Sequence, residues 1–360
     1  MKKLLFFVAV MLLTGVMNVQ GQEKKFSLYA IGFYNLENLF DTCHDEGHND
    51  YEYLPDGRNK WSGMKYTHKL HNMAKVLAEM GTDKIPWGCA AIGVSEVENA
   101  KCMADLCNQP ELKARNYQFC HIEGPDHRGV DCAFIYNPKL FTVRDVKLVP
   151  YIYKLQEDIA KGRATRGFLV VSGTMADEHV TVIVNHLPSR GATSYYRELG
   201  GEQIRAVKDS LLKDDPNVKL FIMGDMNDDP KDPSMSVALG AKRKMKDVEE
   251  GGLFNPFWDI HASGTGTLQY DGAWNLFDQI ILSRSLLDMR YAKEKKPVPP
   301  SKLDCSTLTY WQPQIFRRDY LFQQEGKYKG NTLRTHAGGV WLDGYSDHLP
   351  TLVYLVKERK

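Results

Sequence analysis

Short runs of β-forming residues recur along the chain, and they limit the folds open to it more than any other feature. The runs are rich in Val, Ile, Phe and Tyr and are flanked by Gly, Asn, Asp or Pro, a pattern that predicts strands. They cover residues 28–34, 90–94, 133–136, 168–172, 180–184, 219–223, 279–282 and 352–356. Helical periodicity is clear only at Leu70–Met80 and Ile204–Leu212. Because strands outnumber helices, the sequence predicts an α/β fold in which many strands pair antiparallel.

Five of these runs carry polar residues at one end. The clusters are Asn35-Leu36-Glu37-Asn38, Ser95-Glu96-Val97-Glu98, Asn185-His186, Gly224-Asp225-Met226-Asn227, and a split cluster of Asp278 with Asp347-His348. One such cluster alone is more often a turn or a helix cap. Strand ends at one rim of a sheet can converge on a single pocket, so five clusters in one chain predict a site there.

Two of these clusters indicate the chemistry. An Asp beside a His is useful because the carboxylate can hold a metal while the imidazole meets the substrate, as in Asp347-His348. Asp225 and Asn227 are two residues apart, so on a strand they present a proton acceptor and an amide on one face. Together these residues suggest hydrolysis of a phosphate ester.

The N-terminus differs in kind from the rest of a chain whose composition is otherwise ordinary for a globular protein. Lys2-Lys3 precedes an apolar stretch at Leu4–Leu13 and then small residues, which predicts a signal peptide over residues 1–21 and a single catalytic domain over 22–360. We expect an exported protein, periplasmic or extracellular, with no stable membrane anchor. Removing residues 1–21, which hold two Lys and no acid, lowers the formal net charge from +1 to −1. That charge argues against tight nucleic-acid binding, although not against hydrolysis of nucleic acid.

The clusters, in this order from Asn35 to His348, resemble the endonuclease/exonuclease/phosphatase superfamily, which includes deoxyribonuclease I, exonuclease III, sphingomyelinases and inositol polyphosphate 5-phosphatases. The opening Phe33–Asp41 and the ending Gly344–His348 resemble more specifically a secreted bacterial branch described as nuclease-like. The resemblance implies a four-layer, deoxyribonuclease I-like sandwich of two packed mixed β-sheets flanked by helices.

The same resemblance implies a metal site. Glu96 would be the principal Mg²⁺ ligand, Asp347 would close the site, and Asn35 would lie near both the metal and the substrate. An oxygen-only shell with few protein carboxylates suits Mg²⁺, and Mn²⁺ can substitute. Glu98, two residues from Glu96, is expected to lie on a solvated face instead.

The remaining roles are also those that the resemblance implies. Asp225 would orient or deprotonate the attacking water, and Asn227 would hold that water or a phosphate oxygen. His348, steadied by Asp278, would neutralise charge that develops on the phosphorane, and His186 would bind the phosphate or assist the leaving oxygen. Two arginines would bind substrate: Arg166 near the phosphate, and Arg128, for which a merely solvated side chain is an equal alternative.

The resemblance leaves the substrate open. A nuclease acting on DNA or RNA is the first expectation, and a phosphatase or phosphodiesterase for inositol phosphates, lipid headgroups or other small esters is the alternative. A binding module that has lost its chemistry is a third reading, which the intact polar clusters oppose. Basic and aromatic residues at Gly326–Arg334 could grip a polyanion or could form a wet surface loop. No protein partner is implied.

Overall fold

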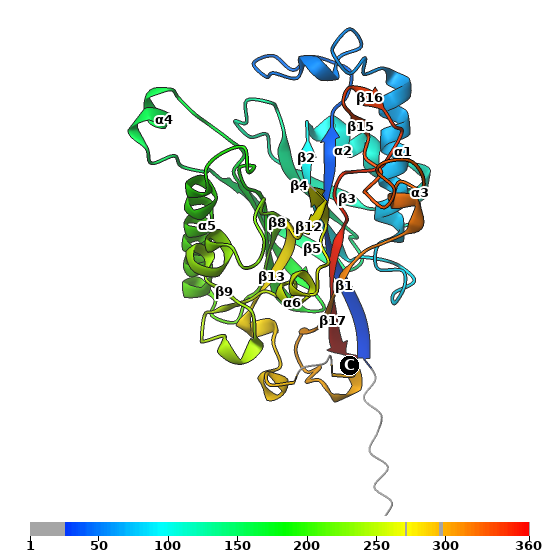
Figure 1. Ribbon diagram of the computed structural model, residues 1–360. Helices are drawn as coiled ribbons and strands as arrows, with labels where there is room; N and C mark the ends of the chain where they lie inside the picture. Colours follow the sequence, from blue (N-terminus) through cyan, green and yellow to red (C-terminus); the bar gives the residue numbers. More distant parts are fainter. Residues whose placement is uncertain (1–25, 271, 295–297, 360) are drawn as a thin grey trace, which may run out of the picture.

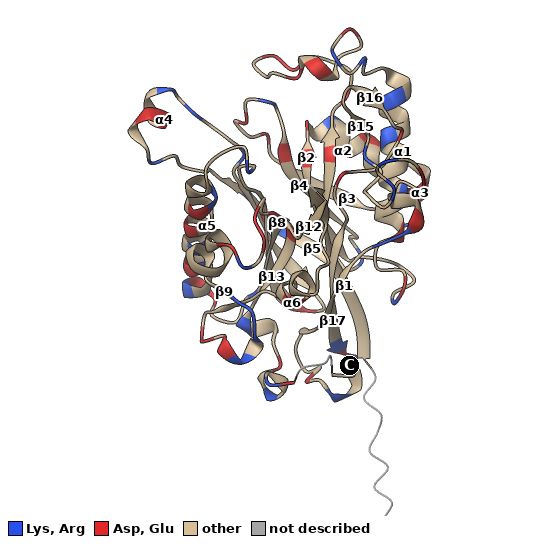
Figure 2. Cartoon of the chain, viewed as in Figure 1, with Lys and Arg blue, Asp and Glu red and all other residues tan. Residues whose placement is uncertain are grey.

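The computed structural model describes residues 26–270, 272–294 and 298–359 (Figure 1). The predicted signal peptide lies outside the described residues. Two large mixed sheets pack face to face between layers of helix, which confirms the predicted α/β sandwich. Charged residues fall mainly in loops and helices, with both signs interspersed, whereas the central strands contain few of them (Figure 2).

The first sheet, here sheet A, has the strand order β14-β17-β1-β2-β4-β3. Its strands are β1 (Phe26–Leu39), β2 (Ala91–Val97), β3 (Gln118–His121), β4 (Asp131–Tyr136), β14 (Thr309–Ile315) and β17 (Thr351–Glu358). Strands β1 and β2 run parallel, and the other neighbours are antiparallel.

The second sheet, sheet B, has the order β5-β6-β7-β8-β13-β10-β9. Its strands are β5 (Phe141–Val149), β6 (Phe168–Met175), β7 (Glu178–His186), β8 (Lys219–Asp225), β9 (Ala241–Lys242), β10 (Leu253–Phe254) and β13 (Asp278–Ser283). Two small hairpins join β11 (Leu268–Tyr270) to β12 (Ala273–Asn275) and β15 (His336–Ala337) to β16 (Val340–Trp341). In sheet B, β7 runs parallel to β8, so the carboxyl ends of these strands share one rim.

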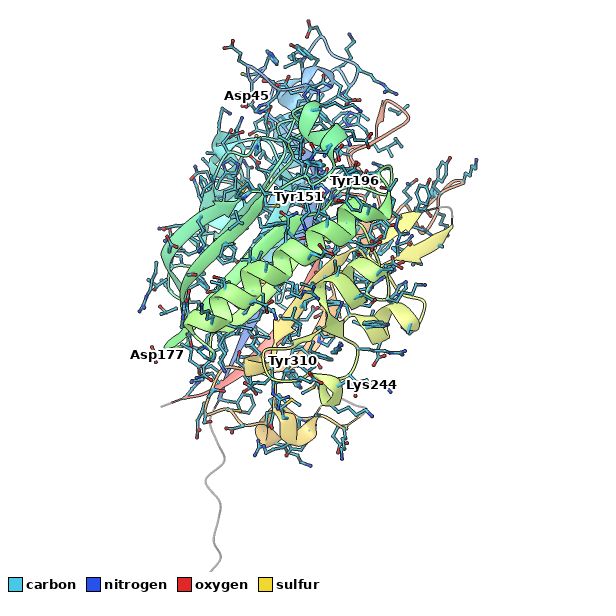
Figure 3. All side chains as sticks on the ribbon, turned by 90° about the vertical axis from the view of Figure 1, so that its left-hand side faces the viewer. Asp45, Tyr151, Asp177, Tyr196, Lys244 and Tyr310 are labelled. Carbon is cyan, nitrogen blue, oxygen red and sulfur yellow. The ribbon has the colours of Figure 1, made fainter. Side chains whose placement is uncertain are left out.

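Helices form the two outer layers. Sheet A is flanked by α1 (Gly63–Glu79), α2 (Ala100–Cys107) and α3 (Pro110–Lys113), and sheet B by α5 (Ser194–Asp214) with a π-helix at Ser234–Leu239. The short helices α4 (Gln156–Ala160) and α6 (Trp258–Ala262) lie in connecting segments. Figure 3 shows α5 running across the outer face of its sheet. Within the described residues, no helix has both the length and the apolar character needed to cross a membrane.

Alternation along the strands of sheet B explains why the layers stack. Val182 and Val184 face the core between the sheets, whereas Ile183 packs in the separate cluster under α5. Gly93 on β2 lets the two sheets approach closely, since a Cβ there would lie 2.6 Å from the sulfur of Met223 on β8. The central strands of sheet B are therefore buried on both faces.

Each predicted strand is present, and the observed ends coincide with the predicted ones or lie up to five residues beyond them, except that β2 begins one residue later than predicted. Both helices begin earlier than the periodicity indicated, at Gly63 and Ser194. The strands absent from the prediction are edge strands or very short, and β3, β5 and β14 are the edges of their sheets. Edge strands keep polar residues and even a proline, Pro313 in β14, so they lack the apolar signature of central strands.

Candidate active site

The polar clusters meet at one rim, where β1, β2, β7 and β8 end and where β13 and β17 begin. Register brings the residues together directly. Asp225, the last residue of β8, pairs with His186 at the end of β7 and with Asp278 at the start of β13. On sheet A, Asn35 of β1 pairs with Ser95, the neighbour of Glu96.

Carboxylates from both sheets approach one another at the centre of this rim. The Asn35 amide Nδ2 donates to Glu96 Oε1 at 3.2 Å and to Asp225 Oδ2 at 3.0 Å, which links sheet A to sheet B. His186 Nε2 lies 3.7 Å from Glu96 Oε1 and 3.5 Å from Asp225 Oδ2. The other Glu96 oxygen accepts the backbone N–H of Asn38 at 2.9 Å. The potential ligand atoms of Glu96, His186 and Asp225 all lie within 4.8 Å of one another.

Glu96 and Glu98 have different surroundings, as the sequence analysis expected, but Glu98 is not solvated. Its carboxylate is buried and accepts the backbone N–H of Asp41 at 2.6 Å, away from the central cluster. Burial raises the pKa of Glu98 to about 8. Glu96 reaches the cluster through a backbone with a positive φ of 62°, an unfavourable conformation for a residue with a Cβ. Such local strain is concentrated at functional sites.

His348 and Asp278 form a buried pair beside the carboxylates. His348 Nδ1 lies 2.8 Å from Asp278 Oδ2, while its Nε2 lies 3.8 Å from Asp225 Oδ2 and 3.9 Å from Asp347 Oδ1. Burial alone would lower the pKa of His348, but the charges of Asp278 and Asp225 outweigh that effect and hold it well above its ordinary value. The imidazole is therefore a fixed cation that points Nε2 into the cluster.

His186 has the opposite electrostatic setting. Burial lowers its pKa well below the usual value, and the nearby guanidinium groups of Arg166 and Arg128 lower it further. The ring is therefore neutral. The same rim thus holds one charged and one neutral imidazole, which can serve different steps of one reaction.

Asn227 shapes the turn after Asp225. Its Nδ2 donates to the carbonyl oxygen of Leu187 at 2.9 Å, and its backbone N–H donates to Asp225 Oδ1 at 2.9 Å. Burial raises the pKa of Asp225 to about 7, even though His348 acts to lower it. A carboxyl group whose pKa lies near neutral pH is suited to exchanging a proton with water.

Asp347 lies beside His348, with its Oδ1 3.9 Å from His348 Nε2, and has an unexpected partner. The guanidinium Nη2 of Arg334 is 3.0 Å from Asp347 Oδ2, and its Nε donates to Glu37 Oε1 at 2.8 Å. The adjacent Ser346 donates its hydroxyl to the carbonyl oxygen of Asn35 at 2.8 Å, which fixes this segment to β1. The sequence marked Glu37 and Arg334 only as members of a polar cluster and a basic loop.

The two predicted substrate arginines differ. Arg166 is buried, and it donates to the carbonyl oxygens of His186 at 2.9 Å and Leu187 at 3.2 Å as well as to Asp126 Oδ2 at 2.9 Å. The structure thus shows Arg166 supporting the end of β7 through protein contacts, and direct contact with substrate stays a prediction. Arg128 is half-exposed, with its Nε 3.8 Å from Asp126 Oδ1.

The donor set of the rim fits a divalent cation. Glu96 and Asp225 bring carboxylate oxygens together in a largely buried place, where only an amide and a neutral imidazole separate them. Neighbouring carboxylates repel one another there even with His348 nearby, so a bound cation would relieve the repulsion. Asp347 supplies a further hard donor, whereas the amide oxygen of Asn35 accepts the backbone N–H of Glu37 at 2.8 Å.

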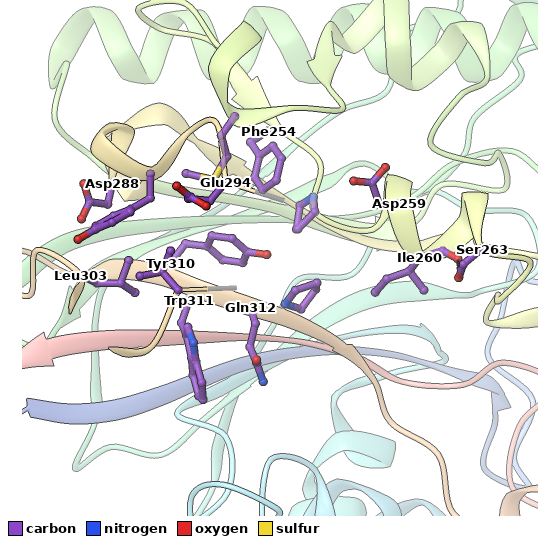
Figure 4. A pocket seen from close by; sticks show the side chains of 15 residues that line it. Phe254, Asp259, Ile260, Ser263, Asp288, Glu294, Leu303, Tyr310, Trp311 and Gln312 are labelled. Atoms are coloured by element: carbon purple, nitrogen blue, oxygen red, sulfur yellow. Dashed lines mark hydrogen bonds between the residues drawn. The ribbon is translucent and has the colours of Figure 1, made fainter. Parts of the chain in front are cut away.

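A cavity of about 490 Å³ lies away from this rim, toward the other end of the sheets (Figure 4). Phe254, Tyr310, Trp311 and Ile260 contribute apolar walls, and none of the predicted site residues lines it. The chemistry-bearing residues and this partly apolar cavity are therefore separate features.

The four-layer fold, with acidic residues and two histidines gathered at one rim, defines a metal-dependent hydrolase of phosphate esters. The model of the Endonuclease/Exonuclease/phosphatase family matches residues 30–357, nearly the whole described chain. The chain belongs to this family.

Solved structures share the fold at low sequence identity. ANGEL2, a 2′,3′-cyclic phosphatase, is 14% identical, with 94% of this chain and 100% of that chain covered and a TM-score of 0.56. A mannosyl-6-phosphatase of Bacteroides thetaiotaomicron is 13% identical (91% and 99% covered, TM-score 0.52). TDP2 of D. rerio, complexed with a single-strand DNA product, is 13% identical (91% and 99% covered, TM-score 0.51). A search of curated protein sequences found no match.

Proposed function

We propose that the protein is an exported, Mg²⁺-dependent phosphodiesterase that acts by direct attack of water, and that nucleic acid is its first substrate class. The observation that carries the proposal is the position of Asp225, whose Oδ2 lies 3.0 Å from the Asn35 amide that also donates to Glu96 and 3.8 Å from His348 Nε2. A group that accepts a proton is thereby placed near both the proposed metal ligand and a positively charged imidazole. This arrangement suits in-line attack on a negatively charged ester.

Glu96 and Asp347 would hold the metal, with Asn35 beside them. When bound, Mg²⁺ would polarise a phosphate oxygen and offset its charge. Asn35 also donates to Asp225, so it holds the metal ligand and the proton acceptor in a fixed relation. Such positioning is worth most when the reacting groups need no rearrangement.

Asp225 would orient the water and accept its proton, with Asn227 beside it to hold the water or a phosphate oxygen. His348 would stabilise charge on the phosphorane through Nε2, because Asp278 holds its Nδ1 side. His186, which is neutral, would bind a phosphate oxygen or assist departure of the leaving oxygen. Removal of one donor to developing charge typically lowers kcat by about 10²–10³-fold.

A small phosphate ester is the second candidate, and the charge pattern favours it. The formal net charge of the whole chain is only +1, and basic and acidic residues are interspersed along the cartoon in Figure 2. Proteins that bind nucleic acid tightly usually gather Lys and Arg on one face. A nuclease of this kind would have to bind its substrate through a local groove.

A parallel assay separates the two substrates. The mature protein with Mg²⁺ is incubated with plasmid DNA, single-stranded oligonucleotides and a panel of phosphorylated small molecules and lipids, alongside His348→Ala. As a control we choose Asp209→Asn, since Asp209 is exposed on α5 and, among the described residues, its carboxylate pairs with Lys208 alone. DNA cleavage that is lost in His348→Ala and kept in Asp209→Asn supports the nuclease. Phosphate release from small esters with intact DNA transfers the proposal to the second candidate.

Export is tested independently of activity. The full chain is expressed in a bacterial host, and the protein from the extracellular and periplasmic fractions is analysed by mass spectrometry. A mature N-terminus close to Gln22 supports the signal peptide, whereas a full-length cytosolic product refutes it.

A further inference from the structure

A smaller cavity of about 190 Å³ opens beside the carboxylate cluster. It is lined by none of the residues that have a role in the proposed mechanism. Its walls are mainly cationic, aromatic and amide side chains: Tyr53, Arg58, Asn59, Trp61, Arg334 and His336. Asn38 also lines it, and the backbone N–H of Asn38 donates to Glu96 Oε2. The cavity is therefore adjacent to the proposed metal ligand.

Arg334 connects this cavity to the active rim. Its Nε and Nη2 are held by Glu37 and Asp347, and no described residue forms a hydrogen bond or ion pair with its Nη1. The side chain is 42% exposed. A guanidinium is planar and carries five donors, so Arg334 keeps donors available for a planar or tetrahedral anion after its protein contacts are made.

Buried charges hold Arg334 in place from behind. Glu37, on β1, accepts from Arg334 Nε and, at 2.7 Å, from the backbone N–H of Thr335. Lys69, on α1, donates to Thr335 Oγ1 at 2.6 Å and to the carbonyl oxygen of Tyr345 at 2.6 Å. Both Glu37 and Lys69 are almost completely buried. Burying ions is costly unless they are paired or hydrogen-bonded, and here the Glu37 ion pair and the Lys69 hydrogen bonds fix the segment that presents Arg334.

Two carboxylates also line the cavity, and neither opposes an anion strongly. Glu37 has its oxygens engaged by Arg334 and Thr335. Glu52 is exposed to solvent, where its field is screened. Arg58 is also exposed, so the free cationic groups of Arg58 and Arg334 remain available to a ligand.

We propose that Arg334 and this cavity form a subsite for a second phosphate group of the substrate, next to the phosphate that is hydrolysed. The inference rests on the proposed function and narrows its substrate class. The cavity of about 190 Å³ has room for a phosphate group. The second phosphate is either the next one along a nucleic-acid strand or a further phosphate of a small molecule.

The test compares two ligands that differ by one phosphate. Binding of thymidine 3′,5′-bisphosphate and thymidine 5′-monophosphate to the Mg²⁺-loaded protein is measured by calorimetry. We expect the bisphosphate to bind at least about tenfold more tightly, since a hydrogen bond to a charged group contributes on that order. Arg334→Gln should remove most of this preference. Equal binding of the two ligands to the wild-type protein overturns the subsite.

Two further variants separate recognition from a structural effect on Asp347. Among the described residues, Arg58 forms no hydrogen bond or ion pair with Glu37 or Asp347. Arg58→Gln should therefore reduce the preference for the bisphosphate about threefold, as expected for an exposed charge. Arg243→Gln is the matched control, because Arg243 is an exposed arginine that pairs with Asp259 away from the rim. A preference that survives in both Arg334→Gln and Arg58→Gln, or that falls equally in Arg243→Gln, also overturns the subsite.

Kinetics distinguishes the two sources of phosphate and keeps the subsite separate from the proposed function. KM is compared for thymidine 5′-(p-nitrophenyl phosphate) with and without a 3′-phosphate, and for a single-stranded oligonucleotide. A KM lowered by the 3′-phosphate alone assigns the subsite to small bisphosphates, and one lowered further by the oligonucleotide assigns it to nucleic acid. Hydrolysis with no effect of the second phosphate refutes the subsite alone, whereas absence of hydrolysis from all phosphate esters refutes the proposed function.

Discussion

Replacing Asp278 by Asn tests whether His348 acts as a fixed cation. The substitution keeps the shape of the side chain but removes the charge 2.8 Å from His348 Nδ1. Because Asp278 is the strongest influence that raises the pKa of His348 against burial, the imidazole should lose its proton more readily in the variant. The rim would then lack the positive charge that the transition state needs.

The magnitude follows from the contacts. A hydrogen bond to a charged group contributes about 1.5–3 kcal/mol, and a lost electrostatic contact to the transition state costs about 2.7–4 kcal/mol. These effects overlap because they act through one imidazole, so we expect kcat to fall by about 10²–10³-fold. KM should change little, since the charge is needed mainly in the transition state.

The assay is a double-substitution cycle on a chromogenic phosphodiester. Asp278→Asn, His348→Ala and the double variant are compared for kcat, with unfolding temperature as a check on folding. If Asp278 acts only through His348, the double variant should be no slower than His348→Ala. Asp288→Asn is the control, because Asp288 is also a buried carboxylate. It pairs with Arg290, and this pair lies away from the rim. Multiplicative losses in the double variant would refute the coupling.

The remaining predictions concern the proton acceptor, the metal, the sheet interface and pH. Asp225→Ala should lower turnover at least about a thousandfold, the scale of a central catalytic group, and unchanged turnover would reject its role. Chelation with EDTA should abolish activity and added Mg²⁺ or Mn²⁺ should restore it, so activity after exhaustive chelation contradicts the metal site. Gly93→Ala should lower the free energy of unfolding by about 1–3 kcal/mol in denaturant titrations, because its Cβ would lie 2.6 Å from the Met223 sulfur. An unchanged denaturation midpoint would show that the two sheets can accommodate the added methyl group. Burial lowers the pKa of His336 in the folded protein to about 4, below the ordinary value of about 6.5 in the unfolded chain. The unfolded chain therefore takes up a proton at higher pH than the folded protein does, and the free energy of unfolding falls as the pH drops from about 6.5 toward 4. His336→Gln should reduce the loss of stability between pH 7.5 and 5 by about 1 kcal/mol, allowing for the half-exposed ring, and an identical loss in both proteins would contradict this assignment.

Much of the rim was predictable because its residues are local to strand ends. Asn35, Glu96, His186, Asp225 and Asp278 each lie at or near the end of an apolar run, so strand prediction placed them correctly once the ends were known to converge. The parallel pairs β1–β2 and β7–β8 then bring such ends to one side, as sheet geometry requires. The edge strands escaped prediction because one side of an edge faces solvent and its pattern is mixed.

The substrate-facing details were not predictable in this way. Arg166 carried the right residue type for a phosphate contact, yet its guanidinium is engaged by backbone carbonyls at the end of β7. Glu98 read as a solvated residue and is instead buried against the backbone of Asp41. In both cases the sequence gives the chemical group, whereas its partner depends on how neighbouring loops pack.

The amino-acid sequence predicts an α/β chain whose strands end in the groups needed for phosphate-ester hydrolysis, because periodicity and strand-end chemistry are properties of short segments. Only packing brings Glu37 of β1 and Lys69 of α1 to the segment of Arg334 and Thr335, although Glu37 and Arg334 lie 297 positions apart. No periodicity encodes such a contact. It exists because a strand of sheet A, a helix and a late loop pack together beside the rim.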